Sequence, residues 1–206
     1  AQQFAGKPVT PEDAMRLAEA RDEFARAAAV MQPFHRQAHD KRASYNYCRL
    51  LILQAEADIS RGDVGGARRA LEESLVVYAK LLEIDPTNTT WLYNALTAET
   101  HLLSLVPPGQ WTARERAALE RIESRLAESW SGDPSDKDYI RLRFRVRNLH
   151  DVVLLHQGDA EAALRSAQQT RQEWRAASEG KALAPEFTLI EARVEKILGS
   201  ALAGAG

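Results

Sequence analysis

The sequence is poor in cysteine and in long apolar runs, and each shortage excludes a class of protein. Its 206 residues hold one cysteine, Cys48, which excludes an internal disulfide and a cysteine-based zinc site. Cys48 stands in an apolar run, so we expect a buried and unreactive thiol. No apolar run approaches the roughly 18 residues of a membrane-spanning helix, and no signal peptide is recognisable. Direct membrane insertion is therefore not expected.

The sequence also lacks an excess of charge of either sign. The 27 lysines and arginines are balanced by 29 aspartates and glutamates, which leaves no general basic field for a nucleic-acid partner. The shortage of lysine relative to arginine, with abundant alanine, is typical of a bacterial protein from a GC-rich genome. Since the first residue is Ala1 rather than methionine, we expect that an upstream segment has been removed. A cytoplasmic location is favoured, or an extracytoplasmic one if that segment was a signal peptide or anchor.

A group of residues recurs along the chain with a period of about 48 residues. Gly62 and Gly158 are each followed by aspartate and, five residues on, by alanine, and Gly109 lies between them. An aromatic residue precedes each glycine by 17 to 19 residues, namely Tyr45, Trp91 and Tyr139. Asp85-Pro86 and Asp133-Pro134 close the first two units. Such a period predicts stacked supersecondary units.

Each unit has the pattern of two helices joined at a glycine. Glycine suits the left-handed C-terminal cap of the first helix, and Asp-Pro ends the second, because proline disfavours helical backbone at the residue before it. Thr112 and Glu115 have the spacing of a capping box. The expected helices are 11–38, with a kink at Pro33, then 43–61, 64–84, 89–106, 112–130, 136–157, 160–178 and 185–203.

Residues 140–147 alternate apolar residues with arginine, which is also the pattern of a half-buried strand. They occupy the place of a first helix, however, and no other segment could pair with a lone strand. We therefore predict a helix over 139–157. Its arginines then form two i,i+4 pairs on different faces, Arg141 with Arg145 and Arg143 with Arg147.

The stretch GDVGGARRALEESLVVYAKLLEIDPTN, residues 62–88, resembles a tetratricopeptide repeat (TPR), and GDAEAALRSAQQ, residues 158–169, is similar. The resemblance implies an all-α right-handed superhelix of stacked antiparallel helix pairs, with about 7–8 helices. It implies an N-terminal helical segment over 1–42, as a cap or a partial repeat, then repeats over 43–88, 89–135 and 136–184, with a partial repeat over 185–206. The period is longer than that of the family. Elongated repeats of this kind resemble those that follow bacterial protein kinases and winged-helix regulators.

Candidate chemistry is sparse, and we expect a chain that is not an enzyme and holds no metal or cofactor. His35 and His39 have the i,i+4 spacing of zinc ligands, but Arg36 lies between them and no third ligand is evident. His101, His150 and His156 lie on expected first helices, without a recognisable nucleophile motif. For the four tryptophans, core packing is favoured over an aromatic groove: Trp91, Trp111, Trp130 and Trp174.

The arginines of the first helices are the main functional lead. In the family that the chain resembles, first helices line a concave binding surface. That resemblance implies a groove lined by Tyr45, Arg49, Asn94, Glu99, Arg141, Arg145 and Asn148. Arginine there would bind a carboxylate or an acidic peptide. The competing interpretation is that these arginines pair with Asp136, Asp138, Glu56 or Glu99 and only solvate helices.

The resulting functional prediction is a non-enzymatic scaffold module that binds a protein or peptide partner, as the interaction or sensing part of a larger bacterial regulatory protein. The first alternative is a structural module that self-associates through apolar positions of the last helix. The second alternative is a helical metal-binding or enzymatic domain.

Overall fold

A computed structural model of the chain describes residues 10–38, 40–129, 137–178, 195, 198–200 and 203. These residues form seven α-helices and one short 3-10 helix, and no strand occurs among them. The predicted all-α fold class is therefore confirmed. The helices are α1 (Pro11–Ala38), α2 (Lys41–Arg61), α3 (Val64–Ile84), α4 (Thr89–Ser104), η2 (Pro108–Gln110), α5 (Ala113–Ser129), α6 (Lys137–His156) and α7 (Ala160–Ser178).

The chain divides into two compact units, Ala1–Leu105 and Val106–Gly206. We call them the N-terminal unit and the C-terminal unit. The boundary falls inside the expected repeat 89–135, between its two helices. The superhelix, the N-terminal segment 1–42 and the repeat boundaries stay predictions, and the expected helix 185–203 lies mostly outside the described residues.

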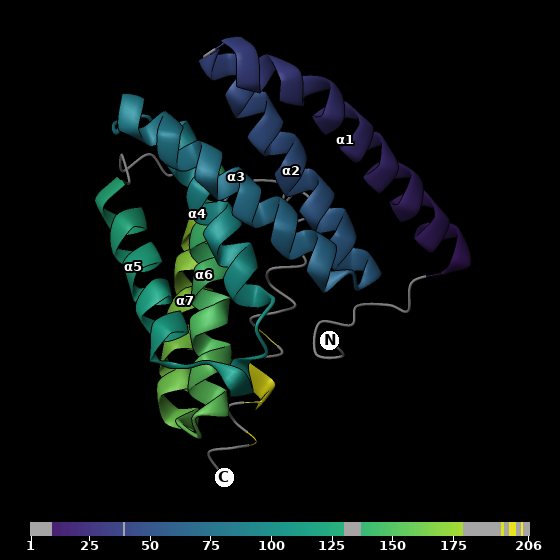
Figure 1. Cartoon of the computed structure of the whole chain (residues 1–206). Coiled ribbons are helices and arrows are strands. Elements are labelled where there is room, and N and C mark those ends of the chain that lie inside the picture. Colours follow the sequence, from purple (N-terminus) through teal and green to yellow (C-terminus); the bar gives the residue numbers. More distant parts are fainter. Residues whose placement is uncertain are drawn as a thin grey trace. The chain divides into compact units, whose positions relative to one another are not determined.

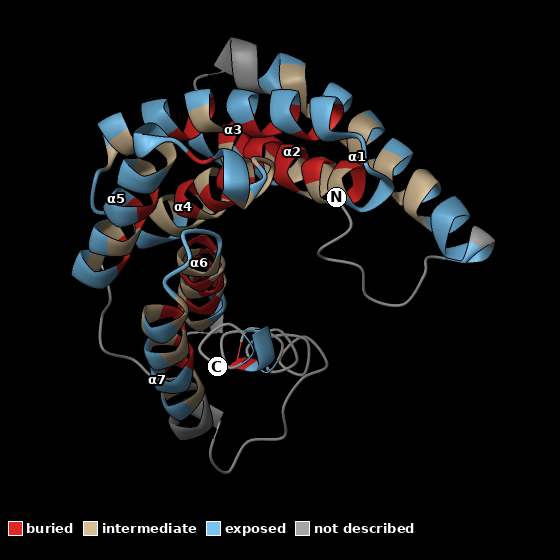
Figure 2. Cartoon of the chain, turned by 90° about the horizontal axis from the view of Figure 1, so that it is seen from below, coloured by how far each residue is buried: buried red, intermediate tan, exposed pale blue. Residues whose placement is uncertain are grey.

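The N-terminal unit is built around α2, which packs against α1 on one side and α3 on the other (Figure 1). α4 then packs on α3. The buried residues lie along the facing sides of these helices (Figure 2). Tyr47, Leu51, Leu71 and Tyr78 are all at most 5% exposed and form the centre of the apolar core. α1 is the longest helix and continues through Pro33.

Helix starts are fixed by side-chain caps that the sequence encodes locally. Asp40 accepts the backbone N–H groups of Arg42 and Ala43 at the start of α2, and Asn88 accepts that of Trp91 at the start of α4. The expected capping box is confirmed before α5. Glu115 accepts the N–H of Thr112 at 2.9 Å, while Thr112 Oγ1 accepts the N–H of Arg114.

The turns at Gly62 and Gly158 are alike down to individual hydrogen bonds. Both glycines have a φ of 80°, the left-handed region in which a side chain would be strained. The aspartate that follows each glycine caps the next helix, since Asp63 accepts the N–H of Gly66 at 2.8 Å and Asp159 that of Ala162 at 3.0 Å. The alanine five residues after each glycine is fully buried. The predicted glycine-linked helix pair is therefore confirmed in both places.

Gly109 does not share this geometry. It lies in η2, and α4 ends at Ser104, earlier than the predicted 106. The reason is Pro107-Pro108, because Pro107 has the extended ψ of 133° that a following proline requires. The segment 89–135 therefore has the residue spacing of the other two segments, but its helices are not joined by a left-handed glycine turn.

The C-terminal unit is built around α6, which contacts η2, α5 and α7. The buried side chains of α6 are Tyr139, Leu142, Phe144, Val146, Asn148, Leu149, Asp151 and Val153. They spread around the helix because neighbours cover it on more than one side. This confirms the helix predicted from the alternating arginine segment and excludes the strand.

Candidate functional site

Among the described residues, each unit contains an open groove bordered by three consecutive helices. The N-terminal groove, between α1, α2 and α3, encloses about 330 Å³. Its polar lining residues are Arg21, Gln32, Tyr47, Gln54, Arg69 and Glu73. The C-terminal groove, between α5, α6 and α7, encloses about 470 Å³. Its polar lining residues are Glu123, Tyr139, Arg143, Arg147, His150, Ser166 and Gln169.

The two grooves use the same positions of the glycine-linked helix pair. Five positions of α2 and α3 that line the first groove recur 96 residues later among those that line the second. The equivalent pairs are Tyr47 and Arg143, Leu51 and Arg147, Gln54 and His150, Ala70 and Ser166, and Glu73 and Gln169. The two glycine-linked helix pairs thus present equivalent positions to their grooves, with different side chains in each.

Arg143 and Arg147 of the C-terminal groove share one carboxylate, that of Glu173 on α7. Arg143 Nη2 lies 2.7 Å and Arg147 Nη1 3.0 Å from Glu173 Oε2. Gln169 donates to the other oxygen, Oε1, at 2.9 Å. The i,i+4 pair predicted for α6 does share a face, and its partner is a glutamate that sequence spacing did not indicate.

The C-terminal unit has two acidic side chains with raised pKa values: Glu123 of α5, which lines the groove, and Asp151 of α6, which does not. Burial raises the pKa of Glu123, whereas His150 and Arg147 act to lower it. The His150 Nδ1 atom is 4.0 Å from Glu123 Oε1. Beneath them Asp151 is fully buried, and burial raises its pKa to about 6 even though the hydroxyl of Ser166 and the charges of His150 and Arg147 lower it.

The N-terminal groove is organised by a chain of hydrogen bonds across its three helices. Gln32 of α1 donates to the Tyr47 hydroxyl at 3.4 Å, and that hydroxyl donates to Glu73 Oε1 at 2.5 Å. At the other end Arg21 contacts Asp58 on α2 at 3.3 Å and its own neighbour Asp22 at 3.0 Å. Asp58 is 1% exposed, so Arg21 compensates a buried charge.

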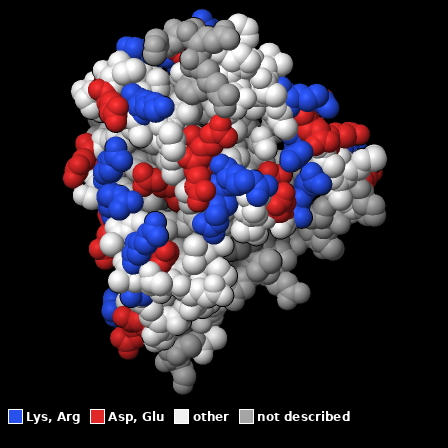
Figure 3. All heavy atoms as spheres, viewed as in Figure 1, with Lys and Arg blue, Asp and Glu red and all other residues white. Residues whose placement is uncertain are grey.

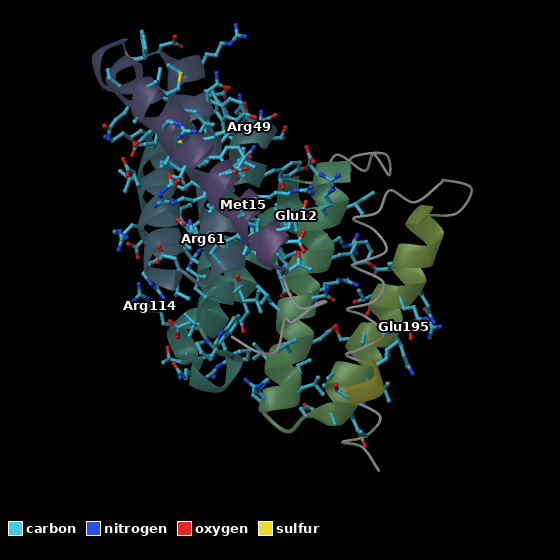
Figure 4. All side chains as sticks on the ribbon, turned by 90° about the vertical axis from the view of Figure 1, so that its right-hand side faces the viewer. Glu12, Met15, Arg49, Arg61, Arg114 and Glu195 are labelled. Atoms are coloured by element: carbon cyan, nitrogen blue, oxygen red, sulfur yellow. The ribbon has the colours of Figure 1, made fainter. Side chains whose placement is uncertain are left out.

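The seven residues predicted to line one groove are divided between the two units. Among the four in the N-terminal unit is Arg49 of α2, which is labelled in Figure 4. Its guanidinium carbon lies 5.8 Å from the ring centroid of Tyr45 on the same helix. Asn94 donates to the backbone oxygen of Thr90 in its own helix, and Glu99 is half-buried. Neither lines a groove described above.

The other three predicted residues, Arg141, Arg145 and Asn148, have the i, i+4, i+7 spacing of one face of α6. Arg141 lies 3.5 Å from Asp138, the pairing that the competing interpretation proposed. Asn148 is buried at 8% exposure, and its amide atoms have no hydrogen-bond partner among the described residues. Sequence reasoning thus favoured one face of α6, whereas the groove lies on the face of Arg143 and Arg147. Arg143 and Arg147 lie 96 residues after Tyr47 and Leu51, and this equivalence is the feature of the sequence that indicates the face of α6 on the groove.

The histidine and tryptophan candidates fall in several environments. His101 pairs with Glu56 at 2.9 Å, and His156 Nδ1 contacts the Val152 oxygen. Trp111 is buried and donates to the backbone oxygen of Val106, and Trp91 packs on the N-terminal core. The metal candidates, the His35 side chain and His39, and the side chains of Trp130 and Trp174 lie outside the described residues.

Four broader findings bear on the site. In the described part of the chain, no group of three or more His, Cys, Asp or Glu side chains is placed to hold a metal ion. The described helices include none long and apolar enough to span a bilayer. Positive and negative side chains are intermixed on the visible surface (Figure 3). No protein-family model, curated protein or solved structure matches the chain.

Proposed function

We propose that the chain is a non-enzymatic helical-repeat module that binds a protein or peptide partner. The observation that carries this proposal is the reuse of equivalent positions, 96 residues apart, to line a groove in each unit. Repeat proteins build extended binding surfaces in this way, by varying the exposed side chains on a constant scaffold. The change from Tyr47 to Arg143, and from Glu73 to Gln169, fits a surface that recognises different side chains in different repeats.

In the C-terminal groove the proposed ligand is an acidic segment of the partner. Each guanidinium carries five N–H donors in a fixed fork suited to carboxylates. The charges of Arg143, Arg147 and Glu173 sum to one positive charge on the α6 and α7 side of the groove, and Glu123 is the acidic lining residue on the α5 side. A partner carboxylate would therefore join Glu173 on the arginine pair or displace it.

The resemblance of residues 62–88 and 158–169 to the tetratricopeptide repeat supports the same class of function. On that resemblance we also propose that the module is the interaction or sensing part of a larger bacterial regulatory protein. This step rests on a likeness of sequence pattern and fold class, not on the chemistry of the grooves.

The test is a selection of randomised peptides on the whole chain, displayed on phage, followed by affinity measurements on the selected sequences by fluorescence anisotropy. We expect enrichment of aspartate and glutamate, and at least a tenfold loss of affinity in Arg143→Gln/Arg147→Gln. The matched control is Arg141→Gln/Arg145→Gln, which removes the same charge from the other face of α6. Loss confined to this control would place the site on the face that the sequence favoured.

A second variant, for which a gain of affinity is expected, separates an effect on binding from a loss of folding. Glu173→Gln removes the internal carboxylate that competes for the arginine pair, so acidic peptides should bind several-fold more tightly. Circular dichroism checks that all variants keep their helix content. Absence of any selected peptide, or unchanged affinity in both Arg143→Gln/Arg147→Gln and Glu173→Gln, would contradict acidic-segment binding in this groove.

A further inference from the structure

The N-terminal groove carries two opposite charges on one helix that do not neutralise each other. Arg69 and Glu73 lie one turn apart on α3, and both line the groove. In the described part of the chain no ion pair joins them, although i,i+4 neighbours often pair in helices. Both residues are exposed. An arginine and a glutamate are therefore presented together, with their charges available to a ligand.

Glu73 is held in place from the floor of the groove. The buried Tyr47 hydroxyl donates to its Oε1 atom, and Gln32 in turn donates to that hydroxyl. The second carboxylate oxygen, Oε2, takes part in none of the described hydrogen bonds, so one oxygen is fixed by the protein and the other is left for a cationic donor.

The remaining positive charge of the groove belongs to Arg69 rather than Arg21. Arg21 is occupied by the buried carboxylate of Asp58 and by Asp22, which exceed its charge. Arg69 lies outside the described ion pairs. Two neutral amides, those of Gln32 on α1 and Gln54 on α2, complete the polar lining opposite α3. Side-chain amides donate and accept at once, which suits a peptide backbone.

We propose that the N-terminal groove binds a zwitterionic segment of a peptide, with a lysine or arginine side chain on Glu73 and a neighbouring aspartate or glutamate on Arg69. This inference rests on the proposed function and adds a charge preference that differs from the acidic preference of the C-terminal groove. The volume of about 330 Å³ is at the lower end of the range for ligand sites, so a short segment of about two residues fits.

The test is a titration of the whole ¹⁵N-labelled chain with capped dipeptides, followed by NMR. We expect acetyl-Lys-Glu-amide to shift the backbone amide signals of Arg69 and Glu73 in a saturable way. Acetyl-Lys-Gln-amide and acetyl-Gln-Glu-amide should each bind about fivefold more weakly, because an exposed charge pair contributes up to about 1 kcal/mol. Equal binding of all three dipeptides, or shifts elsewhere in the chain only, would overturn the proposal.

The chain offers a closely matched control for this groove. Arg69→Gln/Glu73→Gln should abolish the preference for acetyl-Lys-Glu-amide. Arg68→Gln/Glu72→Gln removes the same two charges from adjacent exposed positions of α3 that do not line the groove, and should leave binding unchanged. Equal loss in the two double variants would reduce the effect to general electrostatics and overturn the site.

Two further arms separate this inference from its alternatives. Tighter binding of free lysine than of the capped dipeptide would assign the groove to a free amino acid and overturn the peptide assignment. Arg143→Gln/Arg147→Gln should leave the dipeptide titration unchanged, since it alters the other groove. If the dipeptides fail while selected acidic peptides still require Arg143 and Arg147, the inference fails and the proposed function stands.

Discussion

Gly62 and Gly158 adopt the same left-handed backbone conformation, with a φ of 80°, at the ends of two helices whose equivalent residues are 96 positions apart. A Cβ atom at either position would meet nothing within 4 Å. The requirement for glycine is therefore conformational and not steric. Because the two turns are the same, the helix pairs that they join present the same positions to the grooves.

Substitution of the first glycine should measure this conformational requirement. Gly62→Ala should lower the free energy of unfolding by about 1 kcal/mol, the cost of left-handed backbone for alanine. Gly65→Ala is the matched control, because Gly65 lies in the first turn of α3 and its added Cβ would make only ordinary contacts at 3.6 and 3.7 Å. Alanine there should stabilise by about 0.5–1 kcal/mol. Urea denaturation measures both, and equal effects would contradict the turn.

The sequence predicted the helices well because their ends are encoded by neighbouring residues. Asp85-Pro86 ends α3 at Ile84, and Thr112 with Glu115 starts α5, as expected. α4 ends at Ser104 rather than at the predicted 106, and Gly109 lies in η2 rather than in a left-handed turn like that of Gly62.

The candidate site was predicted less well, because it depends on contacts between helices. The spacing of Arg143 and Arg147 indicated a shared face, but their partner Glu173 lies on the next helix, and no local rule connects it with them. Which face of α6 borders a groove depends on how the helix is rotated against α5 and α7. Helical period alone gives only the relative phase of the residues on it.

Asp151 should make the stability of the C-terminal unit depend on pH. Burial raises its pKa from 3.8 to about 6, so the folded chain holds this proton more tightly than the unfolded chain. Asp151 therefore contributes about 3 kcal/mol to the free energy of unfolding below about pH 4. This contribution is lost as the pH rises through about 6. Asp151→Asn should remove this loss and be more stable than the wild type at pH 7.

The measurement is urea denaturation at several pH values between 4 and 7.5. Asp138→Asn is the control, because Asp138 lies on the same helix but is exposed. Only Asp151→Asn should flatten the pH dependence relative to the wild type. Parallel pH profiles for wild type and Asp151→Asn would show that this carboxyl does not titrate as its burial implies.

Glu173 should contribute more to stability than an ordinary surface glutamate. Its side chain is 29% exposed, pairs with two arginines and accepts a hydrogen bond from Gln169. Glu173→Gln should therefore lower the free energy of unfolding by about 1 kcal/mol. Glu161→Gln is the comparison, since Glu161 pairs with Arg165 alone among the described residues, on an open surface. Its loss should cost less than about 0.5 kcal/mol. Thermal or urea unfolding at low salt distinguishes them, and equal costs would contradict the shared-carboxylate arrangement.

The thiol of Cys48 offers a probe of how often the N-terminal unit opens. Its side chain is fully buried in the core, with Sγ 3.6 Å from the backbone oxygen of Ser74, and burial raises its pKa to about 12. Since the thiolate is the reactive form, the native chain should not react with a disulfide reagent at pH 8 on the timescale of a free thiol. One thiol per chain should react at once in concentrated urea.

In the native state the rate of thiol labelling should rise in Gly62→Ala, which destabilises the adjoining turn, and not in Gly65→Ala. Rapid labelling of the folded wild type would contradict the buried position.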